Sequence, residues 1–335
     1  MLDRPPSETE SESTLHGNRP PRSHLPRVEF RLEQRRHVRG LLSIVYAVTM
    51  SWFTRFAPES VRSFVAKRGG DLAYRLSTEY REHATANLRQ VLGPDYPEGK
   101  LRERVREVFR NSGRNTVDLL MVPHLRSDDI VTRVKLVSGA WSNLDNAFAA
   151  GKGVVVVTAH VGAFDFVGHA LHNRGYRLIS VTGRTTSRFL FDAVTFLRRS
   201  HDMQLVEASP SGIRRVIKAL HRGEGAVFLT DRDFFSSGTT VRFFGRDTTL
   251  SQGAIRIARD TGAMIVPIFG FRTETGHGLR VEPGFHVART TDKEADIVRG
   301  LEQLIPVLER AISATPEQWV MFQPVWPLEP ADRSG

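Results

Sequence analysis

Residues 153–174 read Gly-Val-Val-Val-Val-Thr-Ala-His-Val-Gly-Ala-Phe-Asp-Phe-Val-Gly-His-Ala-Leu-His-Asn-Arg. Four consecutive valines after a glycine are typical of a strand that is buried on both faces, as in a parallel sheet. We expect this strand to end near His160 and a turn to pass through Gly162, where a positive φ costs glycine little. A helix should then begin near Asp165, so the stretch predicts a strand, a tight turn and a helix in succession.

His160 and Asp165 are the first candidates for chemistry. On a regular helix the two side chains would lie on different faces, and on a regular strand they would point to opposite sides of the sheet. The predicted turn could instead bring imidazole and carboxylate together, as a general base held by an orienting acid. The alternative is structural, with His160 a hydrogen-bonded histidine at a strand end and Asp165 the N-cap of the helix. The pair alone leaves both interpretations open.

Strands and helices alternate through the second half of the chain. We predict strands near residues 134–137, 154–159, 177–182, 203–207, 225–230, 263–271, 279–287 and 319–325. We predict helices between them near residues 165–173, 187–200, 210–222, 251–261 and 293–313. Glycine follows several of these helices at the position of a C-cap. The pattern predicts an α/β fold, with a layered, mostly parallel sheet flanked by helices, antiparallel strands toward the C-terminus and an N-terminal helical region.

The chain divides into four predicted parts. Residues 1–30 are rich in Pro, Ser, Glu and Arg and nearly free of large apolar side chains, which predicts a disordered tail. Residues 31–125 carry amphipathic helical patterns, residues 126–327 form the predicted catalytic core, and residues 328–335 form a second tail. The first residues lack the charged and apolar regions of a secretory signal peptide, so we do not expect one.

The segment 40–54 is the most apolar part of the N-terminal region. Its 15 uncharged residues follow several arginines and end near Trp52 and Phe53. As a helix it would reach about 22 Å, which is short of the ~30 Å hydrocarbon core of a bilayer. It is therefore marginal as a membrane span and suits a helix embedded in one leaflet. A buried core helix is the alternative.

The composition limits the classes of chemistry and of partner. The chain has 335 residues, no cysteine and a formal net charge of +10. Disulfides, thiolate metal sites and cysteine nucleophiles are therefore excluded. The basic balance suggests an anionic partner, either phospholipid headgroups, a phosphate-bearing cofactor or nucleic acid. We do not expect nucleic acid, because zinc-finger spacing, aromatic RNA-binding signatures and a long basic tail are all missing from the sequence.

Three loops are expected to share one crevice, because ligands bind beyond the carboxyl ends of the strands in open α/β sheets. His160 follows one strand, and the segments 182–188 and 230–235 follow two others. Arg184 and Arg198 are candidates for gripping a phosphate, since a guanidinium fork matches its geometry. The alternative is that both are surface arginines.

Asp231 ends the apolar strand predicted at 225–230. It could support His160 as a second carboxylate, or pair structurally with Arg232, which we also expect to be a substrate-binding residue. Asp231, Arg232 and Asp233 also form an Asp-x-Asp element, which holds a divalent metal against a nucleotide diphosphate in glycosyltransferases. No cluster of His, Asp and Glu has convincing metal spacing, so we predict no metal site.

Three further positions are expected close to the crevice. Phe244 could line an acyl channel, although core packing is the alternative. Gly245 would allow a close approach of the backbone. Pro267 should end or bend a central strand, since proline cannot donate a hydrogen bond to the ladder.

Five segments in a fixed order carry a family resemblance. They are Gly153-Val-Val-Val-Val-Thr-Ala-His-Val-Gly-Ala-Phe-Asp165, Leu229-Thr-Asp-Arg-Asp233, Val241-Arg-Phe-Phe-Gly245, Ala258-Arg-Asp-Thr-Gly-Ala-Met-Ile-Val-Pro-Ile268 and Pro316-Glu-Gln-Trp-Val-Met-Phe-Gln-Pro-Val-Trp326. Together they resemble the bacterial lipid A biosynthesis acyltransferases, a family of the lysophospholipid acyltransferase-like superfamily that also contains the phosphatidylinositol mannoside acyltransferases. The resemblance covers about residues 60–327.

The resemblance implies a His-x4-Asp/Glu acyl transfer site, carried onto His160 and Asp165, with Asp231 completing the relay to His160. It implies transfer of a fatty acyl group from acyl-CoA or acyl carrier protein, as co-substrate and without a bound cofactor, to a hydroxyl of a lysophospholipid or glycolipid. A phosphatidylinositol mannoside or a lipid A precursor would be such an acceptor. Lipid A members more often carry Asn-Trp-Glu where this chain has Ala163-Phe164-Asp165, which argues against lipid A itself.

These features predict a membrane-associated O-acyltransferase on the cytoplasmic face of the cell membrane. His160 would act as general base, and backbone N–H groups around Gly162 would form the oxyanion site. The basic surface and the segment 40–54 would dock the protein on an anionic membrane. The alternatives are a metal-dependent glycosyltransferase that uses Asp231 and Asp233, and a catalytically silent lipid-binding protein.

Overall fold

The computed structural model describes residues 27–183, 187–233 and 238–327, with side chains from residue 39 onward. The chain forms two compact units, Met1–Arg39 and Gly40–Gly335. Helix α1 (Arg27–Phe56) starts in the first unit and ends in the second, and it begins inside the range predicted for the N-terminal tail. The rest of that predicted tail and the predicted tail 328–335 lie outside the described residues.

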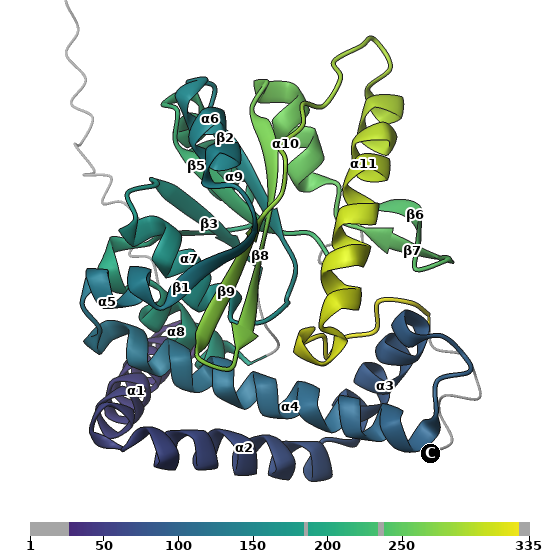
Figure 1. Ribbon diagram of the computed structural model, residues 1–335. Coiled ribbons are helices and arrows are strands. Elements are labelled where there is room, and N and C mark those ends of the chain that lie inside the picture. Colours follow the sequence, from purple (N-terminus) through teal and green to yellow (C-terminus); the bar gives the residue numbers. More distant parts are fainter. Residues whose placement is uncertain (1–26, 184–186, 234–237, 328–335) are drawn as a thin grey trace, which may run out of the picture. The chain divides into compact units, whose positions relative to one another are not determined.

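A seven-stranded sheet forms the centre of the second unit, in the strand order β1-β9-β8-β2-β5-β3-β4 (Figure 1). The strands are β1 (Val134–Gly139), β2 (Val154–Thr158), β3 (Leu178–Thr182), β4 (Gln204–Glu207), β5 (Gly225–Leu229), β8 (Met264–Thr273) and β9 (Gly276–Val281). Only the β8–β9 pair is antiparallel, and the other neighbours run parallel. The predicted α/β class with a mostly parallel sheet is confirmed.

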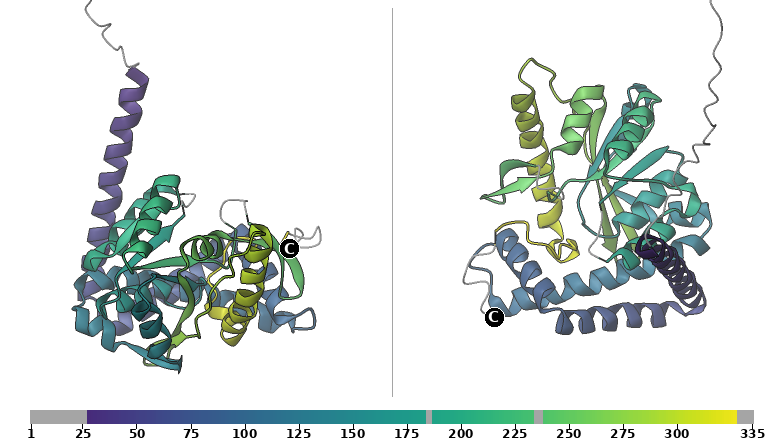
Figure 2. Two further views of the ribbon diagram at one scale, coloured as in Figure 1. Left: turned by 90° about the horizontal axis from the view of Figure 1, so that it is seen from above. Right: turned by 180° about the vertical axis from the view of Figure 1, so that it is seen from behind.

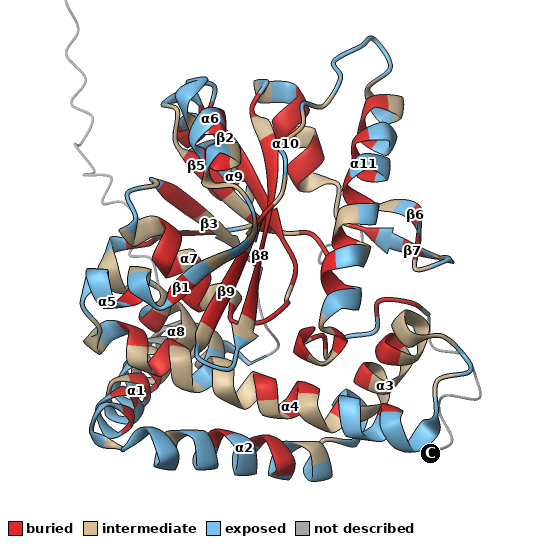
Figure 3. Cartoon of the chain, viewed as in Figure 1, coloured by how far each residue is buried: buried red, intermediate tan, exposed pale blue. Residues whose placement is uncertain are grey.

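Helices cover both faces of this sheet. Helices α5 (Ser127–Thr132), α6 (Trp141–Ala149) and α7 (Phe164–Asn173) pack on one face, and α9 (Pro210–His221), α10 (Gly253–Thr261) and α11 (Lys293–Ala314) pack on the other. Figure 3 shows the central strands as the most continuously buried part of the chain. Burial on both faces explains the valine run, because Val155 and Val157 enter one hydrophobic cluster while Val154 and Val156 enter the other.

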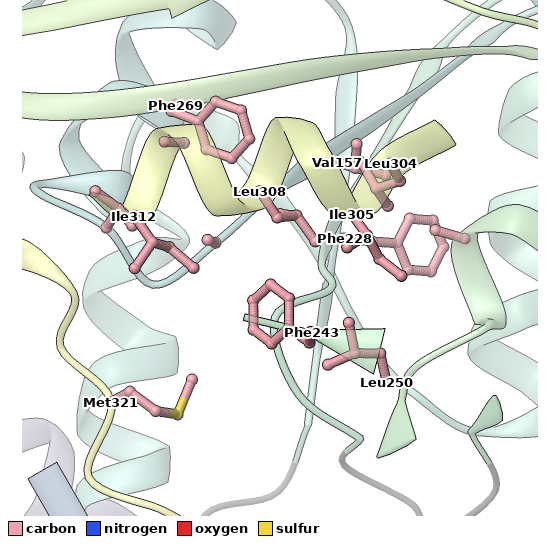
Figure 4. Close-up of a cluster of buried hydrophobic side chains, with 14 of the residues drawn as sticks. Val157, Phe228, Phe243, Leu250, Phe269, Leu304, Ile305, Leu308, Ile312 and Met321 are labelled. Carbon is pink, nitrogen blue, oxygen red and sulfur yellow. The ribbon is translucent and has the colours of Figure 1, made fainter. Parts of the chain in front are cut away.

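The larger cluster lies between the sheet and α11. In Figure 4, Leu304, Leu308 and Ile312 from α11 lie among Val157, Phe228 and Phe269 from the strands. A separate hairpin of β6 (Thr239–Phe243) and β7 (Arg246–Leu250) adds Phe243 and Leu250 to the same cluster. The hairpin turn was not predicted as such, because the polar strand β7 carries little apolar signal.

The predicted N-terminal helical region is present. It comprises α1 together with α2 (Glu59–Leu76), α3 (Thr78–Leu92) and α4 (Glu98–Met121), and Figure 2 shows α2 and α4 side by side. Leu88 of α3 and Leu101, Val105 and Phe109 of α4 belong to the larger cluster. These two helices are therefore part of the same core as the sheet.

The strand predicted at residues 319–325 is wrong. This segment makes one isolated bridge, between Val161 and Trp319, next to which the N–H of Val320 donates to the His160 carbonyl, and it forms no ladder. Buried Asn87 of α3 donates to the carbonyls of Met321 and Gln323 and accepts from the N–H of Val325. The asparagine amide thus supplies the backbone partners that a neighbouring strand would otherwise supply.

Candidate active site

His160 and Asp231 face each other at the carboxyl ends of two adjacent parallel strands. Each residue stands two positions after its strand, β2 for His160 and β5 for Asp231. The ladder between these strands remains in register to its last pair, Thr158 with Leu229. His160 Nδ1 lies 2.9 Å from Asp231 Oδ1, and the His160 backbone N–H donates to Asp231 Oδ2 at 2.8 Å. The sheet register therefore determines the pair.

The Asp231 carboxylate is completely buried and fully engaged. Trp319 Nε1 donates a third hydrogen bond to it, at 2.8 Å from Oδ2. Burial raises the pKa of Asp231, but the attraction of His160 and the hydrogen bonds from His160 and Trp319 outweigh burial and hold the pKa below its usual value. Asp231 is consequently an ionised acceptor at neutral pH.

The imidazole of His160 has one ring nitrogen left for chemistry. Since an ionised carboxylate can only accept, Nδ1 carries the hydrogen and donates it to Asp231, which leaves the lone pair on Nε2. Phe164 packs edge-on against the ring, and 24% of the His160 side chain is exposed. This is the arrangement of an accessible general base that a buried carboxylate orients.

The predicted contact between His160 and Asp165 is not formed. The strand, the positive φ of Gly162 and the helix start all occur as expected, but Asp165 lies in the first turn of α7 and faces Arg198 of α8 (Arg188–Arg198). Arg198 binds its carboxylate with two hydrogen bonds, from Nε at 2.7 Å and from Nη2 at 3.0 Å. A guanidinium fork matches both carboxylate oxygens, so Asp165 pairs with the arginine and leaves the imidazole to Asp231.

Gly162 shapes the loop but does not present its N–H to a substrate. Its N–H donates to the Gln318 carbonyl at 2.9 Å, and its own carbonyl accepts from Asn115 Nδ2 at 2.6 Å. A Cβ at this buried position would lie 2.3 Å from the Gly270 carbonyl oxygen, and φ is +59°. Gly162 is therefore required for the turn, and its own N–H is already used, while an oxyanion site made by other backbone N–H groups around Gly162 stays a prediction.

Comparison with known proteins identifies the family. The family model described as bacterial lipid A biosynthesis acyltransferase matches residues 28–327. The chain belongs to this family. A phosphatidylinositol mannoside acyltransferase of Mycolicibacterium smegmatis is 25% identical over 293 residues, 81% of this chain and 87% of that protein. One of Mycobacterium tuberculosis is 26% identical over 218 residues, 64% and 67% of the two chains. A lipid A biosynthesis acyltransferase of Haemophilus influenzae is 25% identical over 181 residues, 53% and 55%.

Two pockets meet at His160 in this lipid A biosynthesis acyltransferase family member. The larger has a volume of about 990 Å³ and the smaller about 600 Å³. His160, Thr182, Arg198 and Arg232 line both. His160 therefore lies at the junction of the two pockets.

The larger pocket is lined by both polar and apolar side chains. Its polar residues include Asp233, Thr240, Asp247, Thr249 and Gln323. Its apolar residues include Leu190, Phe191 and Val194 of α8. Such a lining suits an amphipathic molecule that carries both hydroxyl groups and apolar chains.

The smaller pocket opens where two neighbouring strands separate. The β3–β5 ladder ends at Ser180 and Val227, although β3 continues to pair with β4 and β5 with β2 beyond that point. Val181 and Thr182 of β3 and Phe228 and Leu229 of β5 therefore flank a gap between the strand ends, and all line the smaller pocket. We call this gap the strand slot. Met203, Leu205 and Ile213 extend its apolar lining.

The three arginines that were predicted to bind substrate differ in where they lie relative to the pockets. Burial lowers the pKa of Arg232, which lines both pockets, and the negative charge of Asp231 opposes that shift. Arg198 also lines both pockets, but Asp165 already binds it. Arg184 lies outside the described residues.

Phe244, Gly245 and Pro267 do not line either pocket. Phe244 and Gly245 form the β6–β7 turn with φ of 49° and 74°, and a Cβ on Gly245 would meet open space, so the glycine serves the backbone conformation and not a close approach. Strand β8 continues through Pro267, which lies where pairing with β2 ends and pairing with β9 begins. The predicted end of the strand at this proline is wrong.

The Asp-x-Asp interpretation does not fit the geometry. Both Asp231 oxygens accept hydrogen bonds from His160 or Trp319, and Asp233 Oδ2 accepts from the N–H of Gly238 at 2.8 Å. Among the residues that the structure describes, no group of three or more His, Cys, Asp or Glu side chains could hold a metal ion.

Sequence reasoning missed Trp319 and Asn115. Trp319 stands in the last segment of the family resemblance, but only the tertiary structure places its indole against Asp231. Asn115 belongs to an amphipathic helix, where an asparagine carries no distinguishing signal, although its side chain holds Gly162 in the loop after His160.

Proposed function

We propose that this family member transfers a fatty acyl group from an acyl thioester to a hydroxyl of a glycolipid or lysophospholipid at a membrane surface. One observation carries the proposal: His160 lies at the junction of the two pockets with Nε2 available, while its Nδ1 is bonded to buried Asp231. A base that touches two binding sites can activate a group in one for attack on a group in the other.

The proposed reaction needs no nucleophile from the protein. His160 Nε2 takes the proton of the acceptor hydroxyl, and the oxygen attacks the thioester carbonyl carbon. When the tetrahedral intermediate collapses, the carbon–sulfur bond breaks and the imidazolium returns the proton to the departing thiolate. Asp231 holds the reactive tautomer and stabilises the imidazolium that forms between these steps.

The pockets suggest which substrate binds where. The strand slot is lined mostly by apolar side chains, which suits a fatty acyl chain whose thioester carbonyl stays beside His160. The larger pocket combines hydroxyl-binding side chains with the apolar wall of α8, which suits the headgroup and chains of an amphipathic acceptor. Two of the relatives are named phosphatidylinositol mannoside acyltransferases, and this supports a glycolipid acceptor of that kind.

Exposed apolar side chains support docking on a membrane. On α1 they include Leu41, Phe53 and Phe56, and on α2 they include Phe64 and Leu76. Phe53 and Phe56 are 71% and 70% exposed. Among the described residues, no helix has the length and hydropathy to cross a bilayer. We therefore propose peripheral binding to an anionic leaflet on the cytoplasmic side, as the net charge of +10 also favours.

The test is incubation of the purified protein with labelled acyl-CoA or acyl carrier protein and a panel of lysophospholipids and glycolipids. Mass spectrometry should find an acceptor heavier by one acyl group, and the two donor arms identify the carrier. A His160→Gln protein, shown to be folded by circular dichroism, serves as the control. Two outcomes would contradict the proposal: hydrolysis of the thioester without any acyl transfer, or equal product formation by the control.

A further inference from the structure

Trp319 is the only tryptophan with a hydrogen bond to the His160–Asp231 pair in the described part of the chain. Its side chain is fully buried, and its indole N–H lies 2.8 Å from Asp231 Oδ2. The same oxygen accepts the backbone N–H of His160, while Oδ1 accepts the imidazole. Two donors on one oxygen hold the carboxylate in a single rotamer, with the other oxygen presented to the ring.

The backbone around Trp319 is tied to the same loop. Trp319 bridges Val161, the N–H of Val320 donates to the His160 carbonyl at 2.8 Å, and the Gln318 carbonyl accepts from Gly162. These backbone bonds fix position 319 relative to the loop after His160. A residue that replaces Trp319 therefore cannot shift to restore the lost hydrogen bond to Asp231.

Helices α3 and α4 hold this segment in place. Asn87 bonds to backbone groups of Met321, Gln323 and Val325, and Asn111 of α4 donates to the Glu317 carbonyl at 2.8 Å. The location of the indole is thus fixed by elements outside the sheet that carries the pair.

We propose that Trp319 is a positioning residue for the acyl transfer reaction: its N–H fixes the Asp231 carboxylate and takes up part of its negative charge, and so holds the oxygen that orients the His160 imidazole. The catalytic role of Trp319 rests on the proposed function. The electrostatic coupling between indole, carboxylate and imidazole does not depend on that function. That coupling can be measured without any substrate.

Other charged groups also border His160, and the measurement has to account for them. Arg198 and Arg232 line both of its pockets, and Asp165, Asp233, Asp247 and Arg256 line one each. Asp165 and Arg198 form a mutual ion pair. Because all six remain in a Trp319→Phe protein, a changed midpoint there reports the loss of the indole N–H.

The first experiment is a nitrogen-15 NMR titration of His160 in full-length protein, with its signal assigned by comparison with a His160→Gln protein. Removing the N–H leaves more negative charge on Asp231, which favours the imidazolium. Trp319→Phe should therefore raise the His160 midpoint by about half a pH unit or more. An unchanged or lowered midpoint would overturn the proposal.

Trp326→Phe is the matched control. Trp326 packs edge-on against Trp319, with ring centroids 6.3 Å apart, and its buried Nε1 has no hydrogen-bond partner in the described part of the chain. The substitution has the same chemistry and a neighbouring location, but it removes an N–H that does not touch Asp231. The His160 midpoint should stay at its wild-type value.

A shape-preserving replacement covers the case in which Trp319→Phe does not fold. Site-specific incorporation of the benzothiophene analogue of tryptophan at position 319 keeps the size of the ring and removes only the donor. It should raise the same midpoint, and a wild-type midpoint would overturn the proposal.

The acid limb of the kcat/KM profile should move in parallel wherever acyl transfer is detected. If the wild-type protein transfers no acyl group, the proposed function fails while the NMR titration still decides the coupling.

Discussion

His160 and Asp231 are 71 positions apart in the chain, and the paired residues of β2 and β5 have the same separation throughout their ladder. The proposed catalytic pair is therefore the continuation of the sheet register beyond the strand ends. A slip of one residue between these strands would send the two side chains to opposite faces. The buried valines of β2 and the apolar residues of β5 make such a slip costly, so core packing and site geometry are stabilised by the same contacts.

Substitution of Asp231 should impair catalysis more than substitution of Asp165. An asparagine at 231 offers one acceptor oxygen where His160 and Trp319 supply three donors. The neutral imidazole can then adopt the tautomer that carries its hydrogen on Nε2, which cannot accept the proton of the acceptor hydroxyl. We expect kcat for Asp231→Asn to fall by roughly 10²–10⁴-fold, as for His160→Gln. Steady-state kinetics on folded proteins would test this. A greater loss of kcat in Asp165→Asn would assign the orienting role to Asp165 instead.

Asp165 and Arg198 should be coupled energetically. Each of their two hydrogen bonds is lost when either partner is removed, so the double substitution Asp165→Ala with Arg198→Ala should cost less than the sum of the single ones. We expect a coupling of about 0.5–3 kcal/mol in the free energy of unfolding, measured with urea. The matched cycle between Asp165 and His160, which share no hydrogen bond, should give less than about 0.5 kcal/mol. A large coupling between Asp165 and His160, together with a small one between Asp165 and Arg198, would show that Asp165 pairs with His160 instead.

The strand slot should limit the length of the acyl chain. Val181→Phe adds a ring at the point where β3 and β5 separate. We expect the preference for palmitoyl over decanoyl donors to fall by roughly tenfold or more, because a few methylene contacts in an apolar pocket are worth that much. Competition assays with mixed donors would measure the ratio. Val137→Phe, on an exposed valine of β1, is the control. Equal ratios in both variants would exclude the slot as the acyl site.

Charge on the exposed face of α1 should weaken membrane binding. Phe53→Asp combined with Phe56→Asp replaces two apolar side chains whose burial in a membrane would contribute about 1.5–3 kcal/mol each. We expect at least about a tenfold loss of binding to phosphatidylglycerol vesicles in co-sedimentation. Val298→Asp places one negative charge at an exposed valine of α11 and should bind like the wild type. Undiminished binding of the double variant would place the docking surface elsewhere.

Buried His277 should make stability depend on pH. Burial lowers its pKa from 6.5 to about 4, with Arg272 and Arg133 acting in the same direction and Asp118 opposing them. Between pH 6.5 and about 4, His277 binds a proton more readily in the unfolded chain than in the folded one. Its contribution to the free energy of unfolding is therefore fully present above pH 6.5 and is lost as the pH falls through about 4. The loss is of the order of 3 kcal/mol.

The variant that tests this is His277→Phe, which preserves the stacking on Phe166. The free energy of unfolding, measured with urea from pH 7 to pH 4, should fall less steeply in this protein than in the wild type. His286→Phe, at an exposed histidine, is the control and should retain the wild-type slope. Identical slopes in all three proteins would show that His277 is not buried in its neutral form.

Most of the sheet and its helices could be predicted because their signals are local. Val154–Thr158 has a run of apolar β-branched residues, α11 has amphipathic periodicity, and Gly262 follows α10 as its C-cap. The segment 319–325 failed for the opposite reason. Its apolar residues have the composition of a strand, but Asn87 on a distant helix takes its backbone hydrogen bonds.

The sequence by itself determined the α/β class, the place of His160 at a strand end and the need for glycine at 162, since each depends on residues that are close in the chain. Only the tertiary structure decided that Asp231 orients the imidazole, that Asp165 binds Arg198 and that Trp319 completes the carboxylate's hydrogen bonds. These choices depend on strand register and on the directions of side chains from distant elements. A short spacing such as that between His160 and Asp165 permits a contact, but which donors reach a carboxylate first depends on the packed fold.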